Sequence, residues 1–228
     1  MSHPLSHHHA NLDGVTLHYV MSGHGPVVVL LHGWPQTWYE WRHIMPALAE
    51  RYTIIAPDLR GLGDSSRPES GYDKKTVAND VWQLVNGKLG HERFFVVGHD
   101  WGGPTAYALA AAHPEAVTRL AILDVVIPGD GGDFSQGGRR WHHQFHLTPD
   151  LPEALTEGRE RPYLSWFYRT FGHRPDAISE VDIDEYCAPT PSRVRCAPAS
   201  TTIAPYHRMR LTIVRTQNAA SCRCPCSR

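Results

Sequence analysis

Two absences divide this chain of 228 residues. Residues 1–186 contain no cysteine, and residues 187–228 contain no acidic residue. No apolar run approaches the roughly 20 residues that a membrane-crossing helix needs. The N-terminal segment MSHPLSHHHANLDG also lacks the apolar core of a secretory signal. We therefore expect a cytoplasmic protein that does not cross a membrane.

Charge follows the same division. Residues 1–186 hold 15 basic and 23 acidic residues, a net charge of −8, whereas residues 187–228 hold seven arginines and all five cysteines. The length suits one core with one insertion. We expect four segments: a disordered leader over 1–11, a core domain over 12–128, a partial cap domain over 129–186, and an aberrant, disordered tail over 187–228.

Strand and helix patterns alternate through the core domain. Residues 15–20 (VTLHYV) alternate like an outer antiparallel strand, whereas the continuous apolar runs are typical of strands buried on both faces. These runs are VVVLL, YTIIAP, RFFVV and RLAILD. Helical spacing occupies residues 38–50, 73–89 and 102–114 between them. The alternation predicts an α/β fold with a parallel-rich sheet and helices on both faces.

An acid stands at the most distinctive turn of the chain. The stretch GHDWGG places Asp100 after a buried strand and before a helix, in a Gly-x-nucleophile-x-Gly turn that exposes one reactive side chain. Asp58 and Asp124 also follow buried strands, so all three acids should gather at the carboxyl edge of the sheet. For Asp58 we favour a structural role, as a helix cap or loop acceptor; for Asp100 we favour catalysis.

A carboxylate nucleophile limits the chemistry. It is ionised at neutral pH, but acyl transfer would give an anhydride, so it suits displacement at a saturated carbon. The product is an alkyl ester on the enzyme. Water then hydrolyses this ester with the help of a histidine base that is held by a second acid. The substrate should therefore be an epoxide or carry a carbon–halogen bond.

Four segments together resemble epoxide hydrolases of the α/β-hydrolase fold, especially the bacterial Cif-type enzymes. They are DGVTLHYV, HGWPQTWYEW, APDLRGLGDS and GHDWGG, and the likeness runs from about Asp13 to Tyr186. The resemblance implies a small apolar epoxide as substrate and no cofactor or metal. It also implies an oxyanion hole made by the backbone N–H groups of Trp34 and Trp101, which would stabilise the charge that develops during ester hydrolysis.

The same resemblance assigns two further residues. The acid that holds the base follows the strand after the turn helix, and LAILDVVIP places Asp124 there. In the cap, RRWHHQFH matches the Cif-type segment whose histidine helps a tyrosine to protonate the opening epoxide oxygen, which makes His142 the candidate. A packing role for His142 is nearly as well supported, and for His143 and His146 it is favoured.

Dehalogenation is the alternative reaction. Fluoroacetate dehalogenases resemble the chain around Asp100, Asp124 and Trp141, but they clamp the substrate carboxylate with arginines where this sequence has Trp101 and Pro104. Haloalkane dehalogenases keep a tryptophan after the nucleophile, so Trp101 does not exclude them. We favour epoxides because of Trp34 and His142. A ligand-binding protein or a fragment without function remains the non-enzymatic alternative.

The tail does not continue the fold pattern. In the family the catalytic histidine follows two more strand and helix units, but residues 187–228 show no such rhythm. Suitable codons for the tail, read with one base restored after Tyr186, give VRTYAQPGALRAGFDYYRALPPDAADN, which has helical spacing, balanced charge and a tyrosine pair. We therefore expect a frameshift after Tyr186, missing C-terminal strands and a chain that cannot turn over.

Two binding roles for unusual segments are not favoured. The arginines of the tail lack the aromatic residues typical of nucleic-acid binding, and CRCPC lacks the usual CxxC spacing of a metal site. The histidines near the N-terminus could bind metal weakly, but their composition is more typical of a disordered leader. We therefore expect no nucleic-acid partner and no metal.

Overall fold

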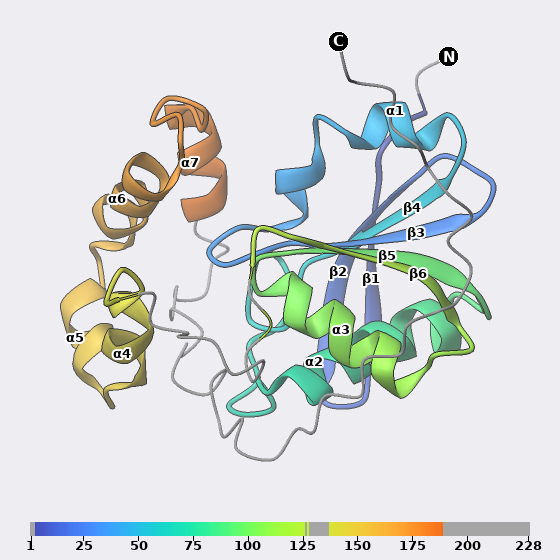
Figure 1. Cartoon of the computed structure of the whole chain (residues 1–228), viewed down its shortest axis with the longest axis horizontal. Coiled ribbons are helices and arrows are strands. Elements are labelled where there is room, and N and C mark those ends of the chain that lie inside the picture. The colour runs from blue at the N-terminus through green and yellow to red at the C-terminus, as the bar shows by residue number, and fades with distance from the viewer. Residues whose placement is uncertain (1–2, 126, 128–136, 189–228) are drawn as a thin grey trace, which may run out of the picture.

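The computed structural model describes residues 3–125, 127 and 137–188 of the chain. Its centre is a six-stranded sheet in the order β1-β2-β4-β3-β5-β6 (Figure 1). The pairs β1–β2 and β2–β4 are antiparallel, and β3–β4, β3–β5 and β5–β6 are parallel. The strands span Ser6–Leu12, Val15–Ser22, Val27–Leu31, Thr53–Pro57, Phe94–His99 and Val117–Leu123, from β1 to β6.

Apolar side chains on both faces of the central strands fix the layers. Every residue of β3 is buried, as are Ile54 to Pro57 in β4, so this part of the sheet needs a cover on each side. The helices α2 (Lys74–Trp82) and α3 (Gly102–Ala112) lie on one face, and η1 (Trp38–Trp41) and α1 (Met45–Ala49) lie on the other (Figure 1). The predicted α/β fold is confirmed.

The helix expected over residues 73–89 has two parts. Asp73 caps α2 by accepting the N–H groups of Lys75 and Thr76, at 3.1 and 3.0 Å. After Trp82 the chain continues as a π-helical segment, η2 (Gln83–Lys88). The predicted apolar face is buried in the main core, with Val77, Val81, Leu84 and Val85.

The leader prediction is wrong for residues 6–11. They belong to β1, which pairs along its whole length with β2, from Ser6 opposite Met21 to Leu12 opposite Val15. Without β1, the backbone N–H and C=O groups on one edge of β2 would have no strand partner. Pairing with β2 therefore explains why residues 6–11 form a strand. The strand that was expected to be the outer one therefore has a neighbour on each side.

The described part of the predicted cap, residues 137–188, contains four short helices, and we keep the name cap for it. They are α4 (Trp141–Leu147), α5 (Leu151–Thr156), α6 (Glu160–Phe171) and α7 (Glu180–Cys187). Leu164 and Tyr168 of α6 and Ile183 of α7 form a small core between these two helices. The predicted cap residues 129–136 and tail residues 189–228 lie outside the described residues. Cys187 ends α7, so the tail expected to start there begins inside a helix.

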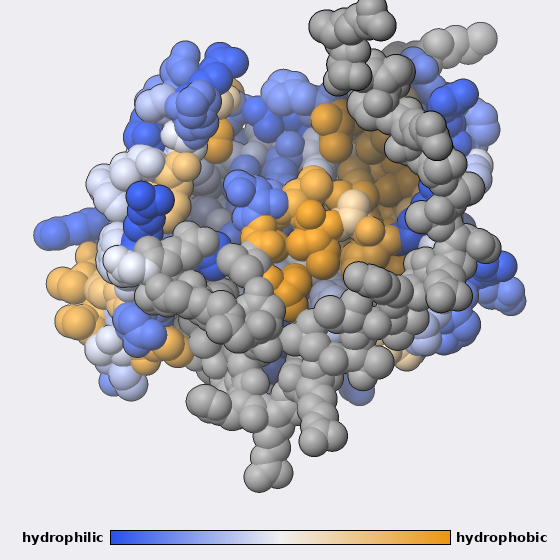
Figure 2. Space-filling model, viewed as in Figure 1, coloured by the Kyte–Doolittle hydropathy of each residue, from blue (hydrophilic) through white to orange (hydrophobic). Residues whose placement is uncertain are grey.

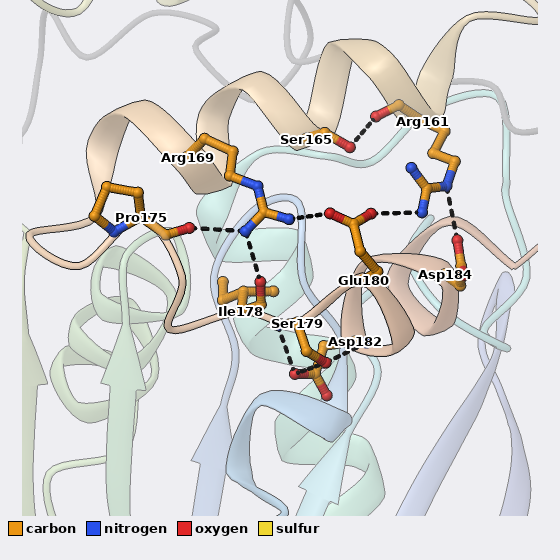
Figure 3. A network of polar contacts seen from close by, with 9 residues as sticks. All are labelled: Arg161, Ser165, Arg169, Pro175, Ile178, Ser179, Glu180, Asp182 and Asp184. Atoms are coloured by element: carbon orange, nitrogen blue, oxygen red, sulfur yellow. Dashed lines mark hydrogen bonds and ion pairs between the residues drawn. The ribbon is translucent and has the colours of Figure 1, made fainter.

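Ion pairs fix α6 against α7 (Figure 3). Arg161 bonds Glu180 and Asp184, and Arg169 pairs with the other oxygen of Glu180. A capping box between Ser179 and Asp182 starts α7. These charges are mostly exposed, so each pair adds little alone, but together they form a network that joins the two helices.

The cap contacts the core along the segment after β3. Arg42 bonds Asp182 at 2.7 Å, and Gln36 donates to the Tyr186 hydroxyl at 3.1 Å. The Tyr168 hydroxyl donates to the carbonyl of Pro35 at 3.2 Å. These contacts place α6 and α7 beside the loop that carries Trp34.

β6 is the last strand of the sheet in the described part of the chain. Its residues are mostly exposed, including Leu120 at 38% and Leu123 at 42%. Figure 2 shows apolar residues gathered on the side where Figure 1 places β6 and α3. An apolar strand with an unpaired edge is a site where a second chain can add. Among the described helices, none has both the length and the apolar character that spanning a membrane requires.

Candidate active site

Asp100 occupies a strained turn between β5 and α3. Its φ angle is 45°, in the left-handed region that non-glycine residues seldom adopt. The Asp100 amide donates to the carbonyl of Leu123 at 3.1 Å, and its own carbonyl accepts from Gly103 at 2.8 Å. Hydrogen bonds therefore hold the turn at both ends, and the chain adopts the tight strand-to-helix turn that the sequence predicts here.

Two glycines allow the turn to pack closely. A Cβ atom on Gly98 would lie 2.3 Å from the carbonyl oxygen of Gly102. A Cβ atom on Gly33 would lie 2.5 Å from the Cβ of Asp100. Because neither distance is sterically possible, Gly98 is needed for the close turn into α3, and Gly33 is needed to bring the loop after β3 against the Asp100 side chain.

Backbone amides hold the Asp100 carboxylate. The Trp34 N–H donates to Oδ1 at 3.0 Å. Burial raises the pKa of Asp100, while hydrogen bonds from the Trp101 and Trp34 amides and the nearby charges of His99 and Lys74 act in the opposite direction. The carboxylate is therefore partly desolvated, and two N–H donors and the charge of Lys74 oppose its protonation. An anion with few bound water molecules is a better nucleophile than a fully hydrated one.

Lys74 is a site residue that sequence reasoning missed. It is the first residue of α2, and its Nζ lies 4.4 Å from the centre of the Trp101 ring. Burial lowers the pKa of Lys74 to about 7, although the negative charges of Asp100 and Asp73 act against this change. A lysine at a helix start carries no sequence motif, so only the fold reveals its position beside Asp100.

His99 and His32 have other partners. His99 Nδ1 lies 3.0 Å from Glu40, which also accepts the N–H of Gly33 at 3.1 Å. Burial opposes protonation of His99, but the contact with Glu40 and its charge outweigh this effect and raise the pKa of His99. His32 is fully buried and accepts the N–H of Leu59 at 2.9 Å. Both histidines support the loops around the site.

The two other strand-end acids differ. Asp58 is buried and accepts N–H groups from Trp38 at 2.8 Å and Asp64 at 3.0 Å, as expected of a structural acid. Asp124 is exposed, has a φ angle of 51° and acts electrostatically on His99. β6 therefore brings Asp124 to the same sheet edge as Asp100, since their strands pair in parallel up to His99 and Leu123.

α4 of the cap lies over the two tryptophans. The His142 ring stacks on Trp34 with centroids 6.4 Å apart, and His143 lies 5.5 Å from Trp101. Within the described part of the chain, His142 Nδ1 is buried and has no hydrogen-bond partner. Burial and the charge of Arg140 lower the pKa of His142 to about 4, so its imidazole is neutral at neutral pH.

Among the described residues, the histidine that bonds a tyrosine is His146. His146 Nε2 lies 2.6 Å from the Tyr163 hydroxyl, and its ring packs at 4.9 Å against Trp34. Burial and the nearby His142 lower the pKa of His146 to about 4. The packing role predicted for His146 is therefore joined by a polar one, which the spacing from 146 to 163 does not reveal.

Comparisons with known proteins agree with this geometry. Residues 26–171 match the model of the alpha/beta hydrolase fold. The chain is 44% identical over 207 residues to the soluble epoxide hydrolase of Corynebacterium sp. (strain C12), covering 88% of this chain and 70% of that protein. It is 43% identical over 154 residues to a fluoroacetate dehalogenase of Burkholderia sp., covering 64% of this chain and half of that enzyme.

Among solved structures, the epoxide hydrolase CorEH without ligand is similar, with a TM-score of 0.80 and 42% identity. The aligned region covers 87% of this chain and 71% of that one. Both the folding pattern and the sequence therefore support the resemblance first seen in the four segments. The chain belongs to the α/β-hydrolase fold family and, within it, to the epoxide hydrolases.

Proposed function

We propose that Asp100 opens a small apolar epoxide and forms an ester with it. A carboxylate oxygen bonds to one epoxide carbon, the bond from that carbon to the epoxide oxygen breaks, and the released oxygen takes up a proton. The hydrogen bond from the Trp34 amide to Asp100 Oδ1, at 3.0 Å, carries this proposal. It fixes the carboxylate at the turn and leaves the cap side to the substrate.

The cap supplies the proton in this proposal. An alkoxide is a poor leaving group unless it is protonated or hydrogen-bonded. His142 has a buried Nδ1 without a hydrogen-bond partner among the described residues, so this nitrogen is open to a hydrogen bond with a substrate. As a neutral imidazole it can donate its ring N–H to the opening epoxide oxygen and take up a proton from solvent at the other ring nitrogen. Trp34, Trp141 and Phe167 surround it and favour an apolar substrate.

The second half of the reaction needs a water activated by a base. In this proposal Asp124 would orient that base, and the Trp34 and Trp101 amides would hold the negative charge of the tetrahedral intermediate. His32 and His99 have the partners described above and do not fill the role of base. We therefore propose that this chain forms the ester and does not release it at a useful rate.

Intact mass after incubation with an aryl epoxide tests the proposal. The cysteine thiols are alkylated first, because they also react with epoxides. The expected result is one adduct per chain with the full mass of the epoxide, together with less than one equivalent of diol. Sustained diol formation would contradict the proposed arrest, and absence of any adduct would contradict the role of Asp100. Asp100→Asn is the control and should stay unmodified.

Dehalogenation is the second candidate, because the Burkholderia relative is a fluoroacetate dehalogenase. Trp101 and Pro104 leave no arginine fork for a carboxylate at the start of α3, and Lys74 offers only a single cation with a pKa of about 7. Epoxides therefore fit the site better than haloacids. Release of fluoride from fluoroacetate, measured with an ion-selective electrode, would reverse this preference.

A further inference from the structure

Three histidines gather where β1 pairs with β2, and one of them, His7, packs against the Trp38 ring of η1 with centroids 5.1 Å apart. The register places His9 opposite His18. Because side chains alternate along a strand, His7 lies on the same face as His9, and His8 points to the other face. The rings of His7 and His9 lie 5.2 and 5.1 Å from that of His18. We call His7, His9 and His18 the strand histidines.

Asp58 fixes the orientation of His18. Its Oδ2 lies 2.7 Å from His18 Nδ1, and both side chains are only 1% exposed. The same carboxylate is held by the amides of Trp38 and Asp64. Since a carboxylate accepts hydrogen bonds, His18 Nδ1 carries the proton and Nε2 presents a lone pair. This is the carboxylate–histidine arrangement that orients imidazoles for metal binding.

The lone pair of His18 points at His7. His18 Nε2 lies 3.0 Å from His7 Nδ1. Two nitrogens bound to one tetrahedral zinc ion at about 2.05 Å lie about 3.3 Å apart, so an outward shift of a few tenths of an ångström would suffice. His7 and His9 are both exposed. His7 can therefore move outward, and a rotation of His9 can bring in a third nitrogen.

We propose that the strand histidines bind one divalent transition-metal ion of the zinc class, with His7 and His18 as the first two ligands. Neutral imidazoles suit zinc, copper and nickel ions, whereas magnesium and calcium prefer oxygen. His9 supplies the third ligand, and Asp58 acts only through His18. The bound ion joins β1 to β2 and stabilises the terminal strand of the sheet. The site is independent of the chemistry at Asp100.

A second group near His18 fits a metal less well. Ligand atoms of His18, Asp58 and Asp64 lie within 4.8 Å of one another. However, the two Asp58 oxygens already accept the Trp38 and Asp64 amides and the His18 N–H. A metal there would break these buried hydrogen bonds, each of which is costly to lose. The His7 side requires only that an exposed imidazole gives up a proton.

Zinc titration of the full chain tests the site, with the thiols alkylated so that Cys222, Cys224 and Cys226 do not compete. His8→Ala is the matched control, because His8 lies on the opposite face, against the Ser6 hydroxyl and the Tyr19 ring. We expect one zinc ion per chain and a higher unfolding temperature with zinc for the wild type and for His8→Ala. His7→Ala should weaken binding by about tenfold or more.

Equal weakening by His7→Ala and His8→Ala would overturn the proposal, because it would indicate loose binding to any histidine near the N-terminus. Binding that is unchanged in His7→Ala would also overturn it. Should His7→Ala unfold, His9→Ala provides the second variant. Its loss of affinity should exceed that of His8→Ala, and equal affinities in these two variants would contradict the third ligand and with it the site.

Discussion

The amide of Trp34 donates to Oδ1 of Asp100 at 3.0 Å, and this contact joins the loop after β3 to the turn after β5. It satisfies a buried carboxylate without neutralising its charge. The resulting anion is oriented and partly dehydrated. The reactivity of Asp100 depends on this state.

Replacement of Asp100 by asparagine should remove the reaction and keep the fold. The amide has no free carboxylate to bond to carbon, so adduct formation should fall by about 10⁴ or more. Since burial raises the pKa of Asp100, its ionised form opposes folding above that pKa. Asp100→Asn should therefore unfold at or above the wild-type temperature at pH 7, and this gain should disappear as the pH falls and Asp100 becomes protonated. A large fall in the unfolding temperature of Asp100→Asn at pH 7 would contradict the prediction that the ionised carboxylate opposes folding.

The charge of Lys74 should control how fast the adduct forms at acidic pH. Its positive charge lowers the pKa of Asp100, against the larger effect of burial. Lys74→Met keeps apolar contact with Trp101 but removes the charge, so the pKa of Asp100 should rise further. The rate of adduct formation at pH 6 should then fall several-fold, with less effect at pH 8, where Lys74 has lost most of its proton. Lys75→Met, at the exposed neighbouring position, is the control and should leave the profile unchanged.

Replacement of His142 should slow the reaction with epoxides more than a loss of ring packing would. His142→Phe retains the contacts with Trp34 and Phe167 but cannot pass a proton. We expect adduct formation with an unactivated epoxide to slow by about 100-fold, with the unfolding temperature nearly unchanged. The exposed His173→Ala is the control. Equal rates for His142→Phe and the wild type would assign His142 to packing, and proton delivery would pass to His146 and Tyr163.

The exposed edge of β6 should determine solubility. Leu120→Lys places a charge on this strand, and edge charges prevent strand addition by a second chain. We expect slower aggregation, measured by light scattering at increasing protein concentration. Val181→Lys is the control: Val181 is 73% exposed but lies on α7, which offers no strand edge. An equal benefit from both variants would point to net charge as the cause.

Restoring one base after the codon for Tyr186 should restore turnover. The frameshift remains a prediction, and resequencing the gene around that codon tests it directly. The chain with the restored frame should release diol repeatedly, whereas the present chain should not. An intact reading frame in the source gene, or a corrected chain without diol release, would contradict this explanation of the tail.

The core was predictable because its signals are local. The buried runs of β3, β4 and β5 and the glycines around Asp100 each determine structure within a few residues. β1 was missed for the opposite reason: SHHHANL has only Ala10 and Leu12 as apolar residues, and its strand conformation comes from pairing with β2. Tertiary contact outweighs composition there.

Some residues of the candidate site could likewise be predicted from local sequence, and others could not. Asp100, Trp34 and Trp101 could be predicted because they stand in short motifs, and the fold brings them together. Lys74 and the His146–Tyr163 pair depend on how α2, α4 and α6 are placed, which no short spacing encodes. Sequence reasoning chose His142 as the partner of a tyrosine, and this choice stays a prediction. Among the described residues a tyrosine contact is made by His146, one turn later in α4.

The nucleophilic role of Asp100 is tested most directly by locating the adduct on the chain. After thiol alkylation and reaction with an aryl epoxide, the digested chain is examined by tandem mass spectrometry. We expect the added mass on the peptide containing Asp100, at that side chain, and we expect Asp100→Asn to abolish it. Labelling at other acids or at the histidines, with the same extent in Asp100→Asn, would contradict a nucleophilic role for Asp100.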